Sequence, residues 1–421
     1  MQQAIEQEVQ VQGLKHFKRL MPLLHRLDEV GCQRDKAGNR RLRMSDYCAA
    51  VLLYLFSPAL NSIRMLQEAM GLAKVAKALK IRRFSLGSFS ESSAVFDPSQ
   101  LKKIIDELAG ELVGLGKDPR LSELKHALTL VDSTVLLGLS RLANAACEQT
   151  RYRTAVDGRP LHGWRLHTQL DLQTFCPRNI QRTGARNAAD NREARVLQHH
   201  LESDRCYVGD GGYTARYLLN QIVEKDSSYV VRVREDSVFV VGEERLLSQE
   251  ALDAGIVRDA VVRLEPVNDL AMNHPVRIVV VQVQPHPRRS RTSQGGMRHT
   301  DVLVLMTNLL DLPPELIGLI YQYRYSVELF FRFFKQLLGM RHLLSQRPRG
   351  VDIQVYCAVM ACLLINLQTG KKPTKMMAQM VGWYLVGMAS EDEMVSFLNR
   401  PDNTGVKKRA KDELWKKLGV N

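Results

Sequence analysis

The chain has 421 residues, of which 45% are hydrophobic and 25% are charged, as in an ordinary globular protein with a large core. Lys and Arg outnumber Asp and Glu by 59 to 45, a net charge of +14 that points to a polyanionic partner, nucleic acid before membrane. The seven cysteines form no C-x-x-C pair, which argues against a disulfide framework or a zinc site and indicates a reduced, cytoplasmic protein. The longest uncharged apolar stretches, 47–60 and 355–368, are shorter than the ~20 residues of a membrane span and are expected to be buried helices.

The first 122 residues are predicted to be helical. Within them, residues 72–83 carry five basic side chains: Lys74, Lys77, Lys80, Arg82 and Arg83. This basic stretch is either a DNA-contacting surface or a solvated charged face, and the pattern alone favours neither.

From residue 123 the pattern changes to strands. Residues 126–137, 163–172, 177–184 and 205–210 are predicted strands, and 189–203 is a predicted helix. This β-β-β-α-β order predicts a mixed sheet with helices packed on it. After Pro313 and Pro314 the chain is predicted to be helical through about residue 369, and so is the basic tail 371–421.

Residues 226–305 contain five further predicted strands with turn residues between them. A basic, Gly-containing loop at 285–299 interrupts this run and is expected to contact the DNA backbone. Its basic side chains include Arg288, Arg289 and Arg291.

Four residues after position 320 have a spacing with chemical meaning. Arg324, Glu328 and Lys335 follow Tyr321 at offsets of 3, 7 and 14 residues. On a single helix, these offsets place all four side chains within an arc of about 60°. One helix face would then present a carboxylate, two cations and a phenol, which suits the binding of a phosphate beside a metal ion.

Two aspartates occupy unusual places in the predicted strands. Asp132 lies inside an apolar strand, and Asp210 ends another and precedes two glycines that fit a sharp turn. Each alone is compatible with a hydrogen-bonded structural role, since an unpaired buried carboxylate is costly. Together with Glu328, they make a set of three oxygen donors that suits Mg²⁺ or Mn²⁺ and not zinc.

These features resemble the signatures of the DDE transposases of the insertion-sequence-4 family. The resemblance covers roughly residues 45–370 and is carried by the strand with Asp132, by the GDGGY segment around Asp210 and by the Y-x2-R-x3-E-x6-K pattern. It implies that two divalent metal ions are bound by Asp132, Asp210 and Glu328. It further implies that terminal phosphates are held by Tyr321, Arg324 and Lys335, with Tyr213 supporting the second acid.

The expected fold is α/β, with a ribonuclease-H-like mixed-sheet core interrupted by an all-β insertion domain. Asp210 and Glu328 are 118 positions apart, and the family accounts for such a gap by a β-rich insertion. The expected boundaries are 1–122 for a helical DNA-binding region, 123–225 and 306–370 for the two parts of the core, 226–305 for the insertion domain, and 371–421 for a helical basic tail.

The resemblance implies a transposase that cleaves the ends of an insertion sequence and joins the 3′-OH ends to target DNA. Its expected partners are double-stranded DNA, as terminal repeats and target, and a second copy of the chain. Two alternatives remain open: a metal-dependent nuclease of the same fold, and an inactive DNA-binding descendant. Relatives that pass through a hairpin stack a flipped base on a Trp, whereas residues 226–305 offer only Tyr229 and Phe239, so the hairpin step also stays open.

Overall fold

The computed structural model describes most of the chain between residues 17 and 398. The described residues are 17–35, 38–57, 60, 62–81, 83–112, 118–137, 163–184, 193–234, 237–265, 271–282, 302–337, 343–345, 347–369, 380, 383 and 388–398. The basic loop predicted at 285–299 lies outside them, as does most of the predicted tail, of which the structure describes the helix α15 (Glu391–Leu398).

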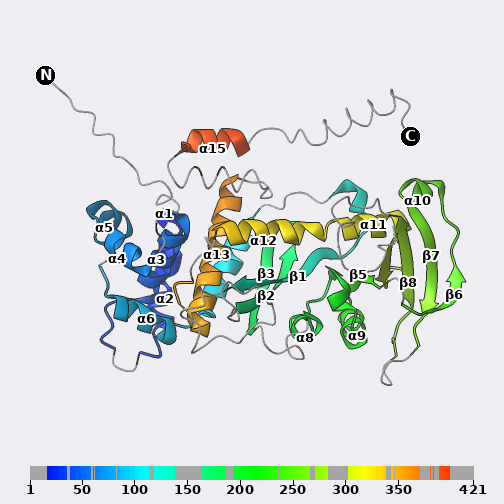
Figure 1. Ribbon diagram of the computed structural model, residues 1–421, viewed down its shortest axis with the longest axis horizontal. Coiled ribbons are helices and arrows are strands. Elements are labelled where there is room, and N and C mark those ends of the chain that lie inside the picture. Colours follow the sequence, from blue (N-terminus) through cyan, green and yellow to red (C-terminus); the bar gives the residue numbers. More distant parts are fainter. Residues whose placement is uncertain are drawn as a thin grey trace, which may run out of the picture.

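The N-terminal part is helical, as predicted, and its helices gather at one end of the molecule (Figure 1). At its centre is α3, which corresponds to the apolar stretch from residue 47 and is buried at every position except Asp46. The basic stretch predicted to be helical over 72–83 is helical only in α5, where Lys77 is exposed. The helix ends at Leu79, because Lys80 follows with a left-handed backbone (φ 56°), and Arg83 lies beyond it. The helices of this part are α1 (Phe17–His25), α2 (Leu27–Val30), α3 (Met44–Phe56), α4 (Ile63–Met70), α5 (Ala73–Leu79), α6 (Leu86–Val95) and α7 (Gln100–Gly110).

One long helix, α13 (Pro348–Thr369), joins the N-terminal helices to the sheet. It packs against α3, α6 and α7 on one side and against β3 and α12 on the other, and Figure 1 shows it between the two parts. The prediction that 355–368 is a buried helix is therefore confirmed, since Val355, Cys357 and Leu363 are all within 2% of complete burial. Among the described residues, no helix is both long enough and apolar enough to cross a membrane.

The predicted β-β-β-α-β order is present. The first three strands, β1 (Ala127–Leu137), β2 (Gly163–Asp171) and β3 (Cys176–Gly184), are antiparallel neighbours. After helix α8 (Glu193–Gln198), β4 (Arg205–Gly209) pairs parallel with β1, and after α9 (Arg216–Glu224), β5 (Ser228–Val233) pairs parallel with β4.

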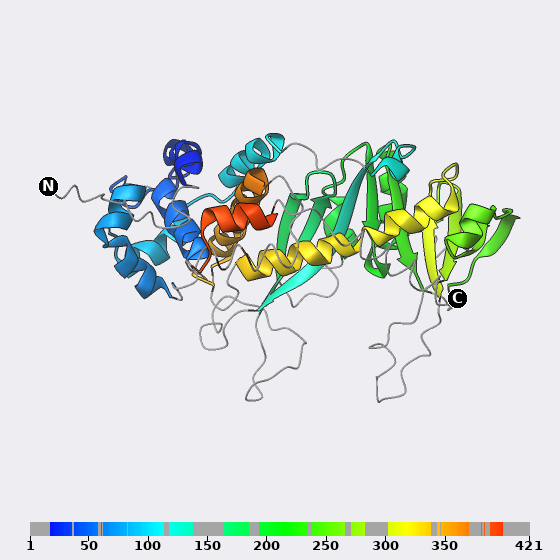
Figure 2. The same cartoon turned by 90° about the horizontal axis from the view of Figure 1, so that it is seen from above.

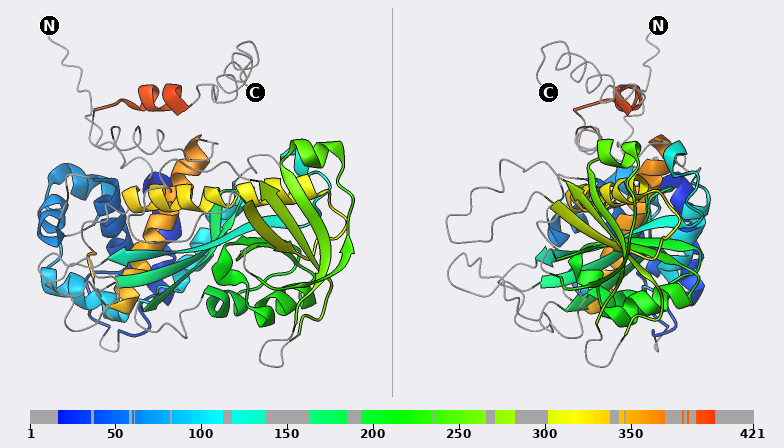
Figure 3. Two further views of the ribbon diagram at one scale, coloured as in Figure 1. Left: turned by 45° about the vertical axis from the view of Figure 1, so that its right-hand side comes forward. Right: turned by 90° about the vertical axis from the view of Figure 1, so that its right-hand side faces the viewer.

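The strands predicted between 226 and 305 continue this same sheet. Beyond β5 come β9 (Val302–Thr307), β8 (Val276–Gln282), β7 (Ile256–Arg263) and β6 (Val240–Glu244), each antiparallel to its neighbour. The described strands thus form one nine-stranded mixed sheet in the order β3-β2-β1-β4-β5-β9-β8-β7-β6 (Figure 3). The expectation of strands alone missed the short helix α10 (Gln249–Asp253), which the Ser248 side chain caps by accepting from the Ala251 N–H at 3.2 Å.

Helices cover the sheet on both faces. Because side chains alternate along a strand, Leu130 and Val208 pack with α11 (Pro314–Gln322) and α12 (Tyr325–Leu337). Val131 and Tyr207 pack on the opposite face with α8 and α9. Figure 3 shows α12 above the sheet and the pair α8 and α9 below it.

A buried ion pair fixes the start of α11. Arg277 on β8 is 1% exposed and donates from Nε and Nη2 to the two carboxylate oxygens of Asp259 on β7, both at 2.7 Å. Its Nη1 donates to the main-chain carbonyls of Leu309, Leu310 and Leu312. The guanidinium therefore has an acceptor for each of these three nitrogens, which a buried charge requires, and it ties the outer strands to the loop before α11.

Candidate active site

The register of the sheet brings Asp132 and Asp210 side by side. Leu130 of β1 is paired with Val208 of β4, and the two aspartates stand two residues further along these parallel strands. Neighbouring strands lie about 4.8 Å apart, and alternation points both carboxylates to the face of Leu130 and Val208. Helix α12, which packs on β1, covers that face.

A tight turn after β4 holds Asp210. Its side chain caps the 3₁₀ turn Gly211–Tyr213 and accepts a hydrogen bond from the Gly212 N–H at 2.9 Å, so the glycines do form the sharp turn that their sequence suggests. The ring of Tyr213 folds under the strand, where a Cβ on Gly209 would lie 2.6 Å from it. Only glycine at 209 leaves room for this ring.

Tyr213 itself is buried with the α8 and α9 helices, on the face of the sheet opposite the two aspartates. Burial raises the pKa of its hydroxyl well above the usual range, and the charges of Asp132, Glu193 and Asp210 raise it further. Tyr213 therefore lies beneath the acids and is neutral at ordinary pH.

The Y-x2-R-x3-E-x6-K segment is not the single helix that its spacing suggested. Tyr321 belongs to α11, Arg324 to the junction, and Glu328 to α12. Across the junction the main-chain hydrogen bonds are of the tighter i→i+3 kind, such as Arg324 N–H to the Tyr321 carbonyl at 3.0 Å. Glu328 consequently falls in the first turn of α12, where the helix dipole favours a carboxylate.

A side-chain contact accompanies this break. The Tyr323 hydroxyl donates to Oδ2 of Asp118 at 2.5 Å, and Asp118 also pairs with Arg120 at 2.7 Å. Hydrogen bonds from Arg120 and then from Tyr323 hold the pKa of Asp118 well below its usual range, so this acceptor is ionised. Figure 2 shows α12 and α11 following one another across the sheet.

Arg324 connects the helix residues to the strand residues. Its Nη2 donates to Oε1 of Glu328 at 2.7 Å, and its Nη1 lies 3.7 Å from Oδ2 of Asp132. The guanidinium also lies 5.9 Å from the centre of the Tyr321 ring. Arg324 thereby brings three other predicted residues, from three separate elements, to one place: Asp132, Glu328 and Tyr321.

The charges in this group act on one another. The pKa of Asp132 is raised to about 6, chiefly by burial and also by the negative charges of Asp210 and Glu328, against the opposing effects of the Ser133 N–H and Arg324. Lys335 is half-buried, and burial lowers its pKa. None of the ion pairs between described residues involves Lys335.

Whether this group suits a metal ion depends on donor chemistry and on placement. Three carboxylates are the oxygen donors that hard divalent cations prefer. Within the described ranges, however, no three His, Cys, Asp or Glu side chains form a ready ligand cluster, and the Arg324 guanidinium lies between Asp132 and Glu328. The three carboxylates therefore fit a divalent metal ion by their chemistry. For an ion to bind between Asp132 and Glu328, it must replace the contacts that Arg324 makes with these two acids.

Sequence reasoning missed a second set of polar residues behind the aspartates. Glu193, the first residue of α8, accepts hydrogen bonds on Oε1 from Ser133 Oγ at 3.0 Å and from Arg165 Nη1. A signal was available, because polar residues alternate with apolar ones along β2, with Arg165, His167 and Gln169 on one face. The pattern places them on a face and does not identify their partner on α8.

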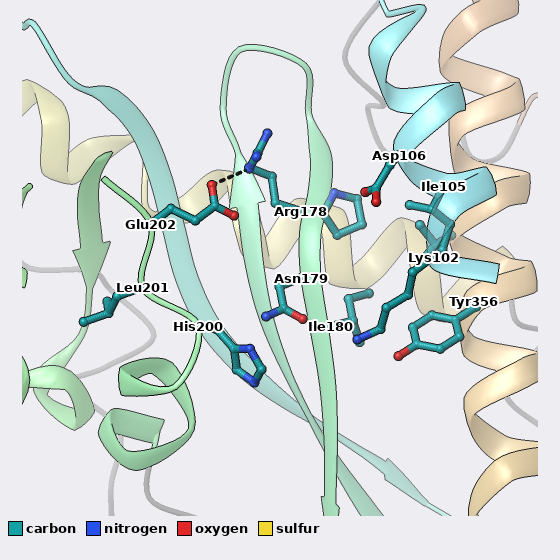
Figure 4. A pocket seen from close by; sticks show the side chains of 12 residues that line it. Lys102, Ile105, Asp106, Arg178, Asn179, Ile180, His200, Leu201, Glu202 and Tyr356 are labelled. Atoms are coloured by element: carbon teal, nitrogen blue, oxygen red, sulfur yellow. Dashed lines mark hydrogen bonds and ion pairs between the residues drawn. The ribbon is translucent and has the colours of Figure 1, made fainter. Parts of the chain in front are cut away.

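A cavity of about 300 Å³ lies apart from this group, between α7, β3, the loop before β4 and α13 (Figure 4). Its polar lining includes Lys102, Asp106 and His200, and Arg178 and Glu202 pair with each other there at 2.9 Å. None of the predicted site residues lines it.

The two aromatic residues of 226–305 differ in access. Tyr229 is completely buried, and its hydroxyl is hydrogen-bonded to Nε2 of His274 at 2.9 Å. Phe239 is partly exposed, with the Arg258 guanidinium 5.9 Å from its ring centre. Of these two, only Phe239 can meet a base.

Comparisons with known proteins find similar chains among the transposases. A putative transposase, y4zB, of Sinorhizobium fredii is 27% identical over 265 residues, which are 63% of this chain and 67% of that protein. A probable transposase for the insertion sequence element IS5377 of Geobacillus stearothermophilus is 25% identical over 57% of this chain and 56% of its own length. The solved piggyBac transposase synaptic complex with hairpin DNA aligns with a TM-score of 0.41 at 11% identity, over 86% of this chain and 74% of that one. Residues 123–364, more than half of the chain, match the family described as the transposase DDE domain, and the chain belongs to that family.

Proposed function

We propose that this protein is a cut-and-paste DNA transposase of the insertion-sequence-4 type. The observation that carries the proposal is the placement of Asp132 in β1 beside Asp210, which directly follows the adjacent parallel strand β4. Arg324 links Glu328 to Asp132. The order β3-β2-β1-β4-β5, with three antiparallel strands followed by two parallel ones, supports a ribonuclease-H-like core.

In this proposal Asp132, Asp210 and Glu328 hold two Mg²⁺ or Mn²⁺ ions. When bound, such ions activate a water or a 3′-OH and stabilise the leaving oxygen of the phosphodiester. The acids must be ionised to hold metal, and burial of Asp132 opposes this.

The basic residues of the helix segment are proposed to bind the terminal phosphates. Arg324 suits this role because a guanidinium binds phosphate oxygens in a two-pronged fashion. Lys335 suits it because it is a half-buried cation with no ion-pair partner among the described residues. Tyr321, whose ring is beside Arg324, supplies a phenol at the same place.

The remaining assignments are proposals that rest on charge and on the family. We propose that residues 1–122 bind DNA, that 123–225 and 306–370 form the core, that 226–305 form the insertion domain, and that 371–421 form a basic tail. The loop arginines 288, 289 and 291 are proposed to contact the DNA backbone. The partners are double-stranded terminal repeats, target DNA and a second copy of the chain.

The test is a reaction in vitro with purified protein, a plasmid carrying the DNA that flanks the gene, and Mg²⁺ or Mn²⁺. We expect metal-dependent cuts at defined ends and joined products. Glu328→Gln should lower cleavage at least about 100-fold, because metal ions contribute several kcal/mol to the transition state, while leaving end binding largely unchanged. Glu250→Gln, at an exposed position of α10, is the matched control and should behave like the wild type.

Two outcomes contradict the proposal in different ways. Cuts without any joined product identify a nuclease of the same fold. Specific binding to the ends without cleavage in either metal identifies a DNA-binding descendant.

A further inference from the structure

We propose that Glu193 is a positioning residue that holds both metal-binding aspartates from the opposite face of the sheet. This inference rests on the proposed function of Asp132 and Asp210. It concerns three side chains that approach one another from three elements: Glu193 on α8, Arg165 on β2 and Ser133 on β1.

The first connection runs to Asp132. The main-chain N–H of Ser133 donates to Oδ1 of Asp132 at 2.7 Å. The hydroxyl of the same serine donates to Oε1 of Glu193 at 3.0 Å and accepts from Nη1 of Arg165 at 3.1 Å. Glu193 therefore fixes the residue whose N–H orients the Asp132 carboxylate.

The second connection runs to Asp210. The Gly212 N–H donates to Oδ1 of Asp210 at 2.9 Å. A Cβ on Gly212 would lie 3.4 Å from Oε2 of Glu193 and 3.1 Å from Oδ1 of Asp210. Glu193 thus packs against the turn that caps Asp210, and Gly212 separates the two carboxylates.

Arg165 makes this arrangement possible. A third carboxylate beside two acids is unfavourable unless a cation compensates it. The Arg165–Glu193 ion pair is about three-quarters buried on each side, with side-chain exposures of 27% and 23%. Since Oε1 of Glu193 already accepts from two donors and lies behind the sheet, the residue suits an orienting role and not metal ligation.

Residues that orient metal ligands typically contribute 10–100-fold to metal affinity. We therefore expect Glu193→Ala to raise the Mn²⁺ concentration for half-maximal end cleavage by at least about 10-fold, with the KM for end DNA unchanged. Direct Mn²⁺ binding to the full chain, measured by electron paramagnetic resonance, should weaken by a similar factor. Glu193→Gln keeps an oxygen for the Ser133 hydroxyl and should recover part of the loss.

Alanine substitutions at two adjacent glycines, Gly211 and Gly212, provide a matched pair of variants that keep the Glu193 side chain. Neither Gly211 nor Gly212 has a positive φ, so alanine fits the backbone at both. Gly212→Ala inserts a methyl between Glu193 and Asp210 and should weaken Mn²⁺ binding, whereas Gly211→Ala meets only the Arg232 carbonyl at 3.7 Å and should not.

The outcomes separate this inference from the proposed function. Unchanged Mn²⁺ affinity in Glu193→Gln and in folded Glu193→Ala, or equal effects of the two glycine variants, overturns the positioning role while the transposase proposal stands. A wild type that binds no Mn²⁺ and cuts no DNA overturns both.

Discussion

Around the two aspartates, burial sets the charge state of single residues. His167 on β2 is 6% exposed and is paired with Ser133 across the sheet. Its Nε2 is hydrogen-bonded to the Thr183 hydroxyl at 2.9 Å. Burial lowers its pKa to about 4, partly against the pull of Glu193, so the imidazole is neutral at physiological pH.

This neutral histidine predicts a pH dependence of stability. Its folded pKa lies below the unfolded value of about 6.5, so on acidification the unfolded chain takes up the proton first. The free energy of unfolding should then fall by about 1.4 kcal/mol per pH unit between pH 6.5 and 4 on account of this residue. Denaturant unfolding should give a free-energy difference between the wild type and His167→Gln that is constant above pH 7 and shifts against the wild type below pH 6. A free-energy difference between the two proteins that stays constant from pH 7 to pH 4 would contradict a lowered pKa for His167.

At the level of elements, the strands were predictable and the helix junction was not. The five strands of 226–305 follow from short apolar runs bounded by turn residues, which are local signals. The break between α11 and α12 coincides with a contact from Tyr323 to Asp118, 205 positions away. Spacing along one segment carries no information about such a contact, and it therefore indicated one helix.

The hydrogen bond at the junction predicts that substitutions of two neighbouring tyrosines, Tyr323 and Tyr325, differ in their effects on stability and end cleavage. Tyr323→Phe removes the hydrogen bond to ionised Asp118 and should destabilise the protein by about 1–2 kcal/mol. The loss of end cleavage should exceed the loss of end binding, because Arg324 lies in the same junction and Tyr321 lies just before it. Tyr325→Phe is the control, since Tyr325 is 46% exposed and its ring faces Arg332. Thermal unfolding and cleavage assays on both variants check this. Equal behaviour of the two contradicts an anchoring role for Tyr323.

At the scale of the whole molecule, the register of the sheet brings together acidic residues whose proximity the sequence pattern alone does not predict. Apolar context and the family resemblance identified Asp132, Asp210 and Glu328 as candidates. Their proximity depends on the parallel pairing of β1 with β4 and on the packing of α12 over β1, which are long-range features. Glu193 was missed for the same reason, because its partner Ser133 is 60 positions away.

The proposed function requires that three carboxylates from distant parts of the chain bind metal at one place. Fe²⁺ with ascorbate and peroxide, used in place of Mg²⁺, cuts a protein backbone beside the bound iron. We expect cuts near residues 132, 210 and 328 together, and we expect excess Mg²⁺ to suppress them. In the double variant Asp132→Asn/Asp210→Asn, the cuts should be lost at all three segments, including the one at 328. Cuts confined to one segment, or a cut near 328 that survives this double substitution, would contradict a shared metal site.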